Sequence, residues 1–170
     1  MRNSSISSYF TAVTKLPPDA TALMHGDSTH PELSGTVRFY QTRAGVLVAA
    51  ELFGLPFSDG VCMSPVFGFH IHSGAACSGT ESDPFADTGT HYNPNDCPHP
   101  YHAGDLPPLF GNHGYAFSMF LTDRFSVKEI IGKTIIVHSL PDDFSTQPSG
   151  NSGSKIACGE ITARYSSLLH

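Results

Sequence analysis

The sequence predicts an all-β fold, a Greek-key antiparallel β-sandwich or flattened barrel of about eight strands with two long functional loops. Short apolar runs recur along the chain and are separated by turn residues. The 170 residues include 16 glycines and 13 prolines, and only 14% of residues are charged. This balance favours short strands and structured loops over long helices.

The first strands follow an N-terminal arm, residues 1–19, which lacks the continuous apolar core of a signal peptide. Residues 20–25 form the first predicted strand. The runs GTVRFYQ (35–41) and VLVAAELF (46–53) are joined by TRAG, and Gly45 lies near the turn. We expect these two runs to form a hairpin.

The remaining strands flank the two long loops. Residues 73–113 are rich in Gly, Pro, Asp, Asn and His, and so long an irregular stretch is unusual in a compact domain unless it is functional. Residues 142–155 form the second loop, and residues 126–132 are long enough only for a helical turn. The other predicted strands are residues 66–72, 115–121, 134–138 and 156–162.

Length and charge limit the number of domains and the kinds of partner that the sequence allows. We expect one domain, residues 20–165, between the arm and a short tail, residues 166–170. The net charge is −6 with only nine Lys and Arg residues, so no basic stripe for a nucleic-acid partner is present. No apolar run approaches the ~18 residues of a membrane span, so no membrane partner is expected.

Seven of the ten histidines fall between residues 70 and 138. Neutral imidazole is a preferred ligand of copper and zinc. On a strand, His70 and His72 would share one face while Ile71 turns into the core. Taken alone, such a pair lies more often on an exposed strand than on a metal.

Residues 91–105 are more specific, because they hold His91, His99, His102 and Asp105 among Asn, Pro and Gly turns. Three imidazoles and one carboxylate complete a tetrahedral zinc shell of the structural kind. The alternative is a histidine-rich surface loop that binds stray metal.

His138 ends the apolar run TIIV, where another aliphatic residue would be ordinary. It is either a buried, hydrogen-bonded core histidine or a third imidazole beside His70 and His72. His91 could supply a fourth through its other ring nitrogen. One deprotonated imidazole can bridge two cations, because each metal offsets the cost of removing its proton.

Five blocks resemble the copper/zinc superoxide dismutase family in its bacterial-type form: FHIHSGAAC, GTHYNP, HAGDLP, VHSLPDDF and GNSGSKIACGEI. They cover about residues 66–161 in the family's order, and the hairpins of residues 20–56 fit the same fold. The resemblance implies two metal sites that share one histidine. Copper would be held by His70, His72, His91 and His138, and zinc by His91, His99, His102 and Asp105.

The resemblance also implies roles outside the two ligand sets. Asp142 resembles the carboxylate that connects a copper-bound and a zinc-bound imidazole and fixes their orientation. Cys77 and Cys158 resemble the family's internal disulfide, which would stabilise the fold by several kcal/mol in the entropy model. Asp143 is expected to brace its loop.

Departures from the family stand out at Lys155, at two cysteines and in the zinc loop, where the spacing from His99 to His102 is shorter than in common members. Lys155 takes the place of the arginine that draws in and orients a small anion, and lysine keeps the charge without the planar pair of donors. Cys62 and Cys97 have no counterpart in the usual motifs, and they form either a second disulfide or two ordinary thiols. His113 is expected to be a turn residue, and His25, His30 and His170 are expected to be solvated without partners.

The implied reaction is disproportionation of superoxide to dioxygen and hydrogen peroxide, with Lys155 and His91 as the catalytic residues. The alternative is a non-catalytic copper- and zinc-binding protein of the same fold, which would be expected to lack a copper ligand. Besides superoxide as the substrate, the expected partner is a second copy of the chain in a homodimer. The disulfide and the resemblance favour a secreted, periplasmic or cell-surface location.

Overall fold

The computed structural model describes residues 11–60, 62 and 65–164, and its strands confirm the predicted all-β class. Among these residues nine strands are present where eight were expected. The run at 66–72 breaks at Gly68, and Leu109 and Phe110 pair with its first half. The strands are β1 (Ala20–Gly26), β2 (Ser34–Thr42), β3 (Gly45–Phe53), β4 (Val66–Phe67), β5 (Phe69–His72), β6 (Leu109–Phe110), β7 (Ala116–Thr122), β8 (Thr134–His138) and β9 (Lys155–Ala163).

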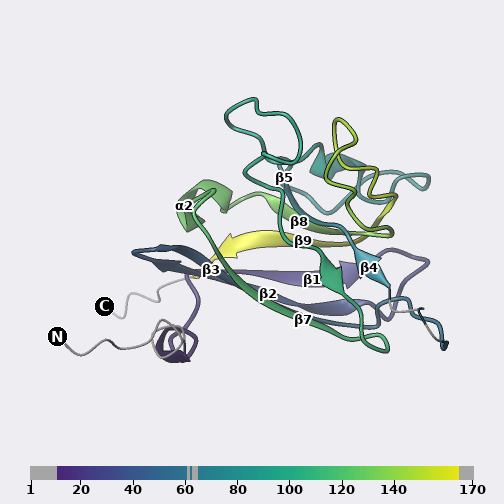
Figure 1. The fold of residues 1–170 in the computed structure, drawn as a ribbon, viewed down its shortest axis with the longest axis horizontal. Coiled ribbons are helices and arrows are strands. Elements are labelled where there is room, and N and C mark those ends of the chain that lie inside the picture. The colour runs from purple at the N-terminus through teal and green to yellow at the C-terminus, as the bar shows by residue number, and fades with distance from the viewer. Residues whose placement is uncertain (1–10, 61, 63–64, 165–170) are drawn as a thin grey trace.

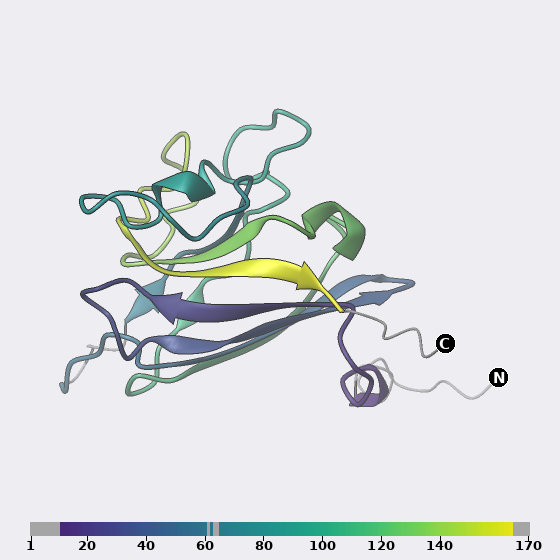
Figure 2. The same ribbon diagram turned by 180° about the vertical axis from the view of Figure 1, so that it is seen from behind.

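Seven strands form one antiparallel sheet in the order β5-β8-β9-β1-β2-β3-β7, and β4 pairs with β6. Figures 1 and 2 show the sheet curling into a half-barrel, with the long loops gathered beyond β5 and β8. The curl places β5 and β8 above β1, β2 and β3 in Figure 1, so that the apolar core lies between them.

The core follows from the alternation of side chains along the strands. In β3, Val46, Val48, Ala50 and Leu52 are fully buried. Every residue of β5 and β8 is buried, because their second face is covered by the loops. Burying one large aliphatic side chain contributes about 1.5–3 kcal/mol. The strands that carry the histidines therefore belong to the best-packed part of the molecule.

The predicted hairpin is present, and its register pairs Thr42 with Gly45. Gly45 has a φ of 128°, and a Cβ there would collide with the Thr122 carbonyl of β7. A residue with a side chain would therefore separate β3 from β7.

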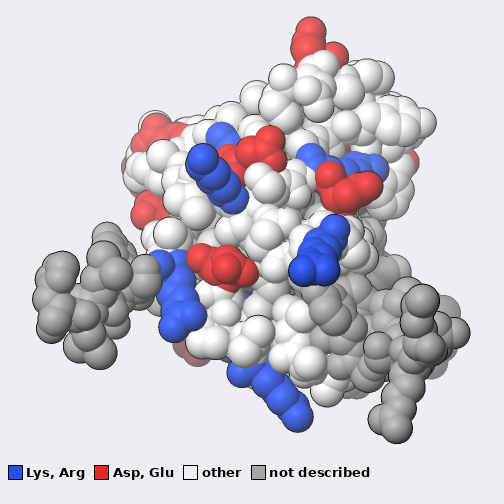
Figure 3. Space-filling view, turned by 90° about the vertical axis from the view of Figure 1, so that its left-hand side faces the viewer, with Lys and Arg blue, Asp and Glu red and all other residues white. Residues whose placement is uncertain are grey.

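Two short helical turns interrupt the loops. The 3₁₀ turn η1 (Ala86–Thr88) lies in the first loop, and α2 (Val127–Ile130) begins at a capping box of Ser126 and Glu129. The arm also turns helically at residues 11–13. Within the described residues, no helix is long and apolar enough to span a membrane. On the face in Figure 3, basic and acidic side chains are interspersed.

Candidate metal centre

Two strands position three buried imidazoles. His70 and His72 lie on β5, which pairs with β8, and His138 ends β8 at an irregularity after Val137. Asp105 and His91 join β5 through isolated bridges to His70 and His72, respectively. The first loop is thus attached to the strand that carries the histidines.

The side chains gather into two groups whose donor atoms lie within 4.8 Å of one another. All seven contributing residues are buried, and His91 belongs to both groups. The strand group consists of His70, His72, His91 and His138, and the loop group consists of His91, His99, His102 and Asp105.

In the strand group, hydrogen bonds at one ring nitrogen leave the other nitrogen with its lone pair. His72 Nδ1 donates to the Gly89 carbonyl at 2.9 Å, and His138 Nδ1 donates to the Gly153 carbonyl at 3.4 Å. Their Nε2 atoms then face each other at 3.3 Å. Two acceptors at this distance repel unless a cation or proton lies between them.

In the loop group, Asp105 is the centre of the contacts. Its Oδ1 accepts from His91 Nδ1 at 2.7 Å, and its Oδ2 lies 3.1 Å from His99 Nδ1 and 3.3 Å from His102 Nδ1. Four buried ring nitrogens have no hydrogen-bond partner among the described residues: His70 Nδ1, His91 Nε2, His99 Nδ1 and His102 Nδ1. Such orphaned buried atoms indicate a missing partner.

Asp142 contacts both groups. Its Oδ2 accepts from His70 Nε2 at 2.7 Å, and its Oδ1 accepts from His99 Nε2 at 2.9 Å and from the Phe144 backbone N–H at 2.7 Å. Gly150 packs against this carboxylate, where a Cβ would collide with it. These bonds hold the proton of each imidazole on Nε2, so Nδ1 of His70 and of His99 is available to a metal.

The pKa shifts favour the protonation states that metals require. Burial lowers the pKa of His70, His72 and His138, that of His138 to about 3, and neighbouring imidazoles lower the last two further. Burial alone would raise the pKa of Asp142 and Asp105, but hydrogen bonds from His70 and His91, respectively, outweigh it and lower both. A neutral imidazole and an ionised carboxylate are the forms in which these side chains bind a metal.

Lys155 lies at the mouth of the strand group. Together with His72, His91 and His138 it lines a cavity of about 360 Å³. Its Nζ donates to the Phe85 carbonyl at 2.9 Å and lies 3.5 Å from Asp83 Oδ2. The ammonium is therefore anchored, and part of its charge is offset by a carboxylate that no sequence motif singled out.

The residues present fit copper and zinc. Four imidazoles suit copper, and three imidazoles with a carboxylate suit zinc. The family described as copper/zinc superoxide dismutase (SODC) matches residues 33–161. The chain belongs to the copper/zinc superoxide dismutase family. The family's metals are copper and zinc, as expected from the sequence.

Individual dismutases support this assignment. The chain is 33% identical over 141 residues to superoxide dismutase [Cu-Zn] of Photobacterium leiognathi, covering 75% of this chain and 78% of that protein. It is 32% identical over 153 residues to that of Legionella pneumophila, covering 84% and 86%. The structure of Cu/Zn superoxide dismutase from Brucella abortus aligns with a TM-score of 0.69 at 25% identity, covering 83% of this chain and 98% of that one.

The cysteines separate into one bonded pair and two thiols. Cys77 and Cys158 form the predicted disulfide, which ties the first loop to β9. Of the two alternatives for the other pair, the structure has two thiols, because Cys62 is an exposed free thiol and Cys97 is a half-buried free thiol. Cys97 is held by Asn93, which bonds its backbone N–H and its carbonyl.

The histidines outside the two groups differ from one another. His113 is an exposed turn residue with a positive φ of 48°, as expected. His30 is not partnerless, because its Nδ1 lies 2.8 Å from Asp27 Oδ1. The ring of His25 packs against Phe85, and His170 lies outside the described residues.

Proposed function

We propose that the protein is a superoxide dismutase with copper held by the strand group and zinc held by the loop group. The observation that carries the proposal is the convergence of ring lone pairs in two buried clusters that share His91. Burying unpaired acceptors is costly, and a metal at each cluster would satisfy them. The family assignment supports the same reaction.

When bound, copper supplies an electron acceptor and donor, so that two superoxide ions and two protons yield one dioxygen and one hydrogen peroxide. The chain's own residues do the remaining work. His70, His72 and His138 are held by strand ladders and by bonds at their other nitrogens, so they need little rearrangement. Asp142 keeps the protons of His70 and His99 on Nε2.

His91 is the residue that would handle a proton. Its Nε2 faces the strand group, and its Nδ1 bonds Asp105. An imidazole in this position can hold a proton at Nε2 and release it toward the cavity.

Lys155 would attract and seat the anion. It is the basic residue among those lining this cavity, and the protein as a whole is acidic, so the attraction must be local. A lysine offers a point charge rather than two aligned donors. We therefore expect efficient capture with looser orientation.

The test is metal analysis followed by a dismutation assay of the protein loaded with both metals. The proposal requires one copper and one zinc per chain together with rapid superoxide loss. Full loading without dismutation would favour the alternative, a metal-binding protein without catalysis. As a control, His70→Gln, which removes one lone pair from the strand group, should lose copper and activity together.

Location and assembly follow as two further proposals. The Cys77–Cys158 disulfide favours an oxidising compartment, whether secreted, periplasmic or at the cell surface. Alkylation of thiols in intact cells would reveal the bonded pair if this is correct. A homodimer remains a prediction, and sedimentation analysis would test it.

A further inference from the structure

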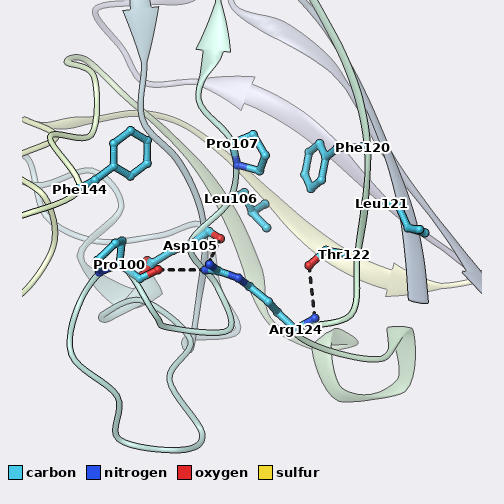
Figure 4. A pocket seen from close by; sticks show the side chains of 9 residues that line it. All are labelled: Pro100, Asp105, Leu106, Pro107, Phe120, Leu121, Thr122, Arg124 and Phe144. Carbon is cyan, nitrogen blue, oxygen red and sulfur yellow. Dashed lines mark hydrogen bonds between the residues drawn. The ribbon is translucent and has the colours of Figure 1, made fainter. Parts of the chain in front are cut away.

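Arg124 reaches from the end of β7 to the loop group. Figure 4 shows its side chain crossing the floor of a cavity of about 320 Å³ toward Pro100 and Asp105. The two N–H groups of Nη1 are shared among three backbone carbonyls, those of Pro100 at 3.0 Å, His102 at 3.1 Å and Asp105 at 3.1 Å. One atom therefore joins three points of a six-residue segment.

The segment is also held at Gly104, whose backbone N–H donates to the Tyr92 carbonyl and whose carbonyl accepts from the Ile71 backbone N–H. Among the described residues, Arg124 is the only hydrogen-bond donor found for the carbonyls of Pro100 and Asp105. The His102 carbonyl also accepts from the Asp105 backbone N–H at 3.2 Å. Charge-assisted bonds to carbonyls are stronger than neutral ones. The guanidinium thus restrains the segment at three carbonyls, two of which have no other donor among the described residues.

Two of the three carbonyls belong to His102 and Asp105, whose side chains are members of the loop group. Fixing a residue's carbonyl restricts its backbone and hence the direction of its side chain. The base of Arg124 is also fixed, because it follows a sheet strand and its backbone N–H bonds Thr122 Oγ1 at 3.3 Å. The sheet is thereby connected to the loop ligands.

We infer that Arg124 is a positioning residue that presets His102 and Asp105 for zinc. The inference rests on the proposed zinc site. The expected effect of Arg124 on zinc affinity is opposite to that of its charge alone, because a cation close to a zinc ion repels it. Removing the charge alone would strengthen zinc binding, whereas removing the carbonyl contacts would weaken it.

The experiment compares Arg124→Met with the wild-type chain and with Arg43→Met, which removes an exposed arginine from the β2–β3 turn. Zinc affinity is measured by competition with a chromogenic chelator, and cobalt(II) in place of zinc reports ligand geometry by its visible spectrum. We expect Arg124→Met to bind zinc about 10-fold more weakly. Its cobalt spectrum should change, while copper affinity and the Arg43→Met control stay close to wild type.

Each other outcome overturns the inference. Zinc affinity equal to or tighter than that of Arg43→Met would contradict it, and so would a lower Tm of the metal-free protein with unchanged zinc affinity. If Arg124→Met does not fold, Arg124→Lys provides the test, because lysine keeps the charge but is one bond shorter. It should also bind zinc more weakly. A wild-type chain that binds no zinc would instead overturn the proposed function.

Discussion

The strand group and the loop group share His91 but are held by different means. His70, His72 and His138 sit on β5 and β8, whose backbone ladders fix them. His99 and His102 sit in an irregular segment that is held largely by side chains. Gln147 is one of these, since its Oε1 accepts from the His99 backbone N–H at 3.0 Å and its Nε2 donates to the His99 carbonyl at 2.7 Å.

The comparison shows that the positions of the ligand residues are fixed by different interactions in the two groups. A strand ladder restricts the backbone through many bonds in a packed core, so it persists when one side chain is lost. The loop is joined to β5 by backbone bridges at His91 and Asp105. The segment around His99 and His102 depends on long-range contacts from Asp142, Arg124 and Gln147. The loop group should therefore depend more on its own metal and on single substitutions than the strand group does.

Asp142→Ala should have the largest effect, because it acts on both groups. His70 and His99 would each lose the acceptor of Nε2–H, and their orientation and tautomer would no longer be set. We expect affinity for both copper and zinc to fall by about 10–100-fold. Isothermal titration with each metal measures this. Loss confined to one metal would show that the carboxylate does not connect the groups.

Removing zinc should separate the two regions. With a zinc-selective chelator, amide hydrogen exchange should rise in residues 93–103 and stay low in β5 and β8. The strands keep their backbone hydrogen bonds without metal, whereas the segment loses the zinc that would link His99 to His102. Equal deprotection of both regions would show that the difference in support does not exist.

Gln147→Leu should weaken the loop group alone. It removes two bonds to the backbone of His99, each with a net value of about 1 kcal/mol. We expect zinc affinity to fall by roughly 3–30-fold, with copper affinity unchanged. Chelator competition measures both affinities. Gln41→Leu is not a suitable control, because Gln41 Oε1 accepts from the Val127 backbone N–H at the start of α2.

Charge at the cavity mouth should change the rate by a few-fold without changing metal content. Lys155→Arg restores two aligned donors and should raise the dismutation rate. Asp83→Asn should also raise it at low ionic strength, because Asp83 offsets the Lys155 charge at 3.5 Å. Pulse radiolysis at several salt concentrations measures both variants. A Lys155→Arg rate equal to wild type would contradict the looser orientation of the anion. An Asp83→Asn rate equal to wild type would contradict the offset of the Lys155 charge.

The smallest effect concerns the second loop. Hydrogen bonds from the Thr146 side chain and backbone, and then from Ser145, lower the pKa of Asp143 to about 2, so this carboxylate does brace its loop. A lowered pKa stabilises the fold above pH 4, and this stability is lost as the pH falls toward 2. The Tm of metal-free Asp143→Asn should therefore lie slightly below wild type at pH 5, and the gap should close near pH 2.

Two local rules made part of the ligand sets accessible from the sequence, whereas the inclusion of His138 and the sharing of His91 rested on the family resemblance. Alternation on a strand places His70 and His72 on one face, and turn residues around His91, His99 and His102 allow a loop to fold back. The structure brings together all seven residues that were expected. The bounds of the strands that were predicted agree to within one or two residues, whereas β6 was not predicted.

What the sequence could not reveal are contacts between distant residues that no motif marks. Arg124 lies 22 residues from His102, and Gln147 lies 48 residues from His99. Each depends on how the barrel places two loops together. The sequence also left open whether Cys62 and Cys97 are bonded, because the distance between them depends on the path of the loops, and the fold leaves both as free thiols.

Asp142 has a thermodynamic consequence for how the protein acquires its metals. One carboxylate orients an imidazole in each group, and His91 belongs to both, so an ion at one group alters the free energy of binding at the other. Linkage requires this influence to be reciprocal: the factor by which zinc changes copper affinity equals the factor by which copper changes zinc affinity. If both groups hold metals as proposed, their binding is therefore coupled, with the same factor in either order of loading.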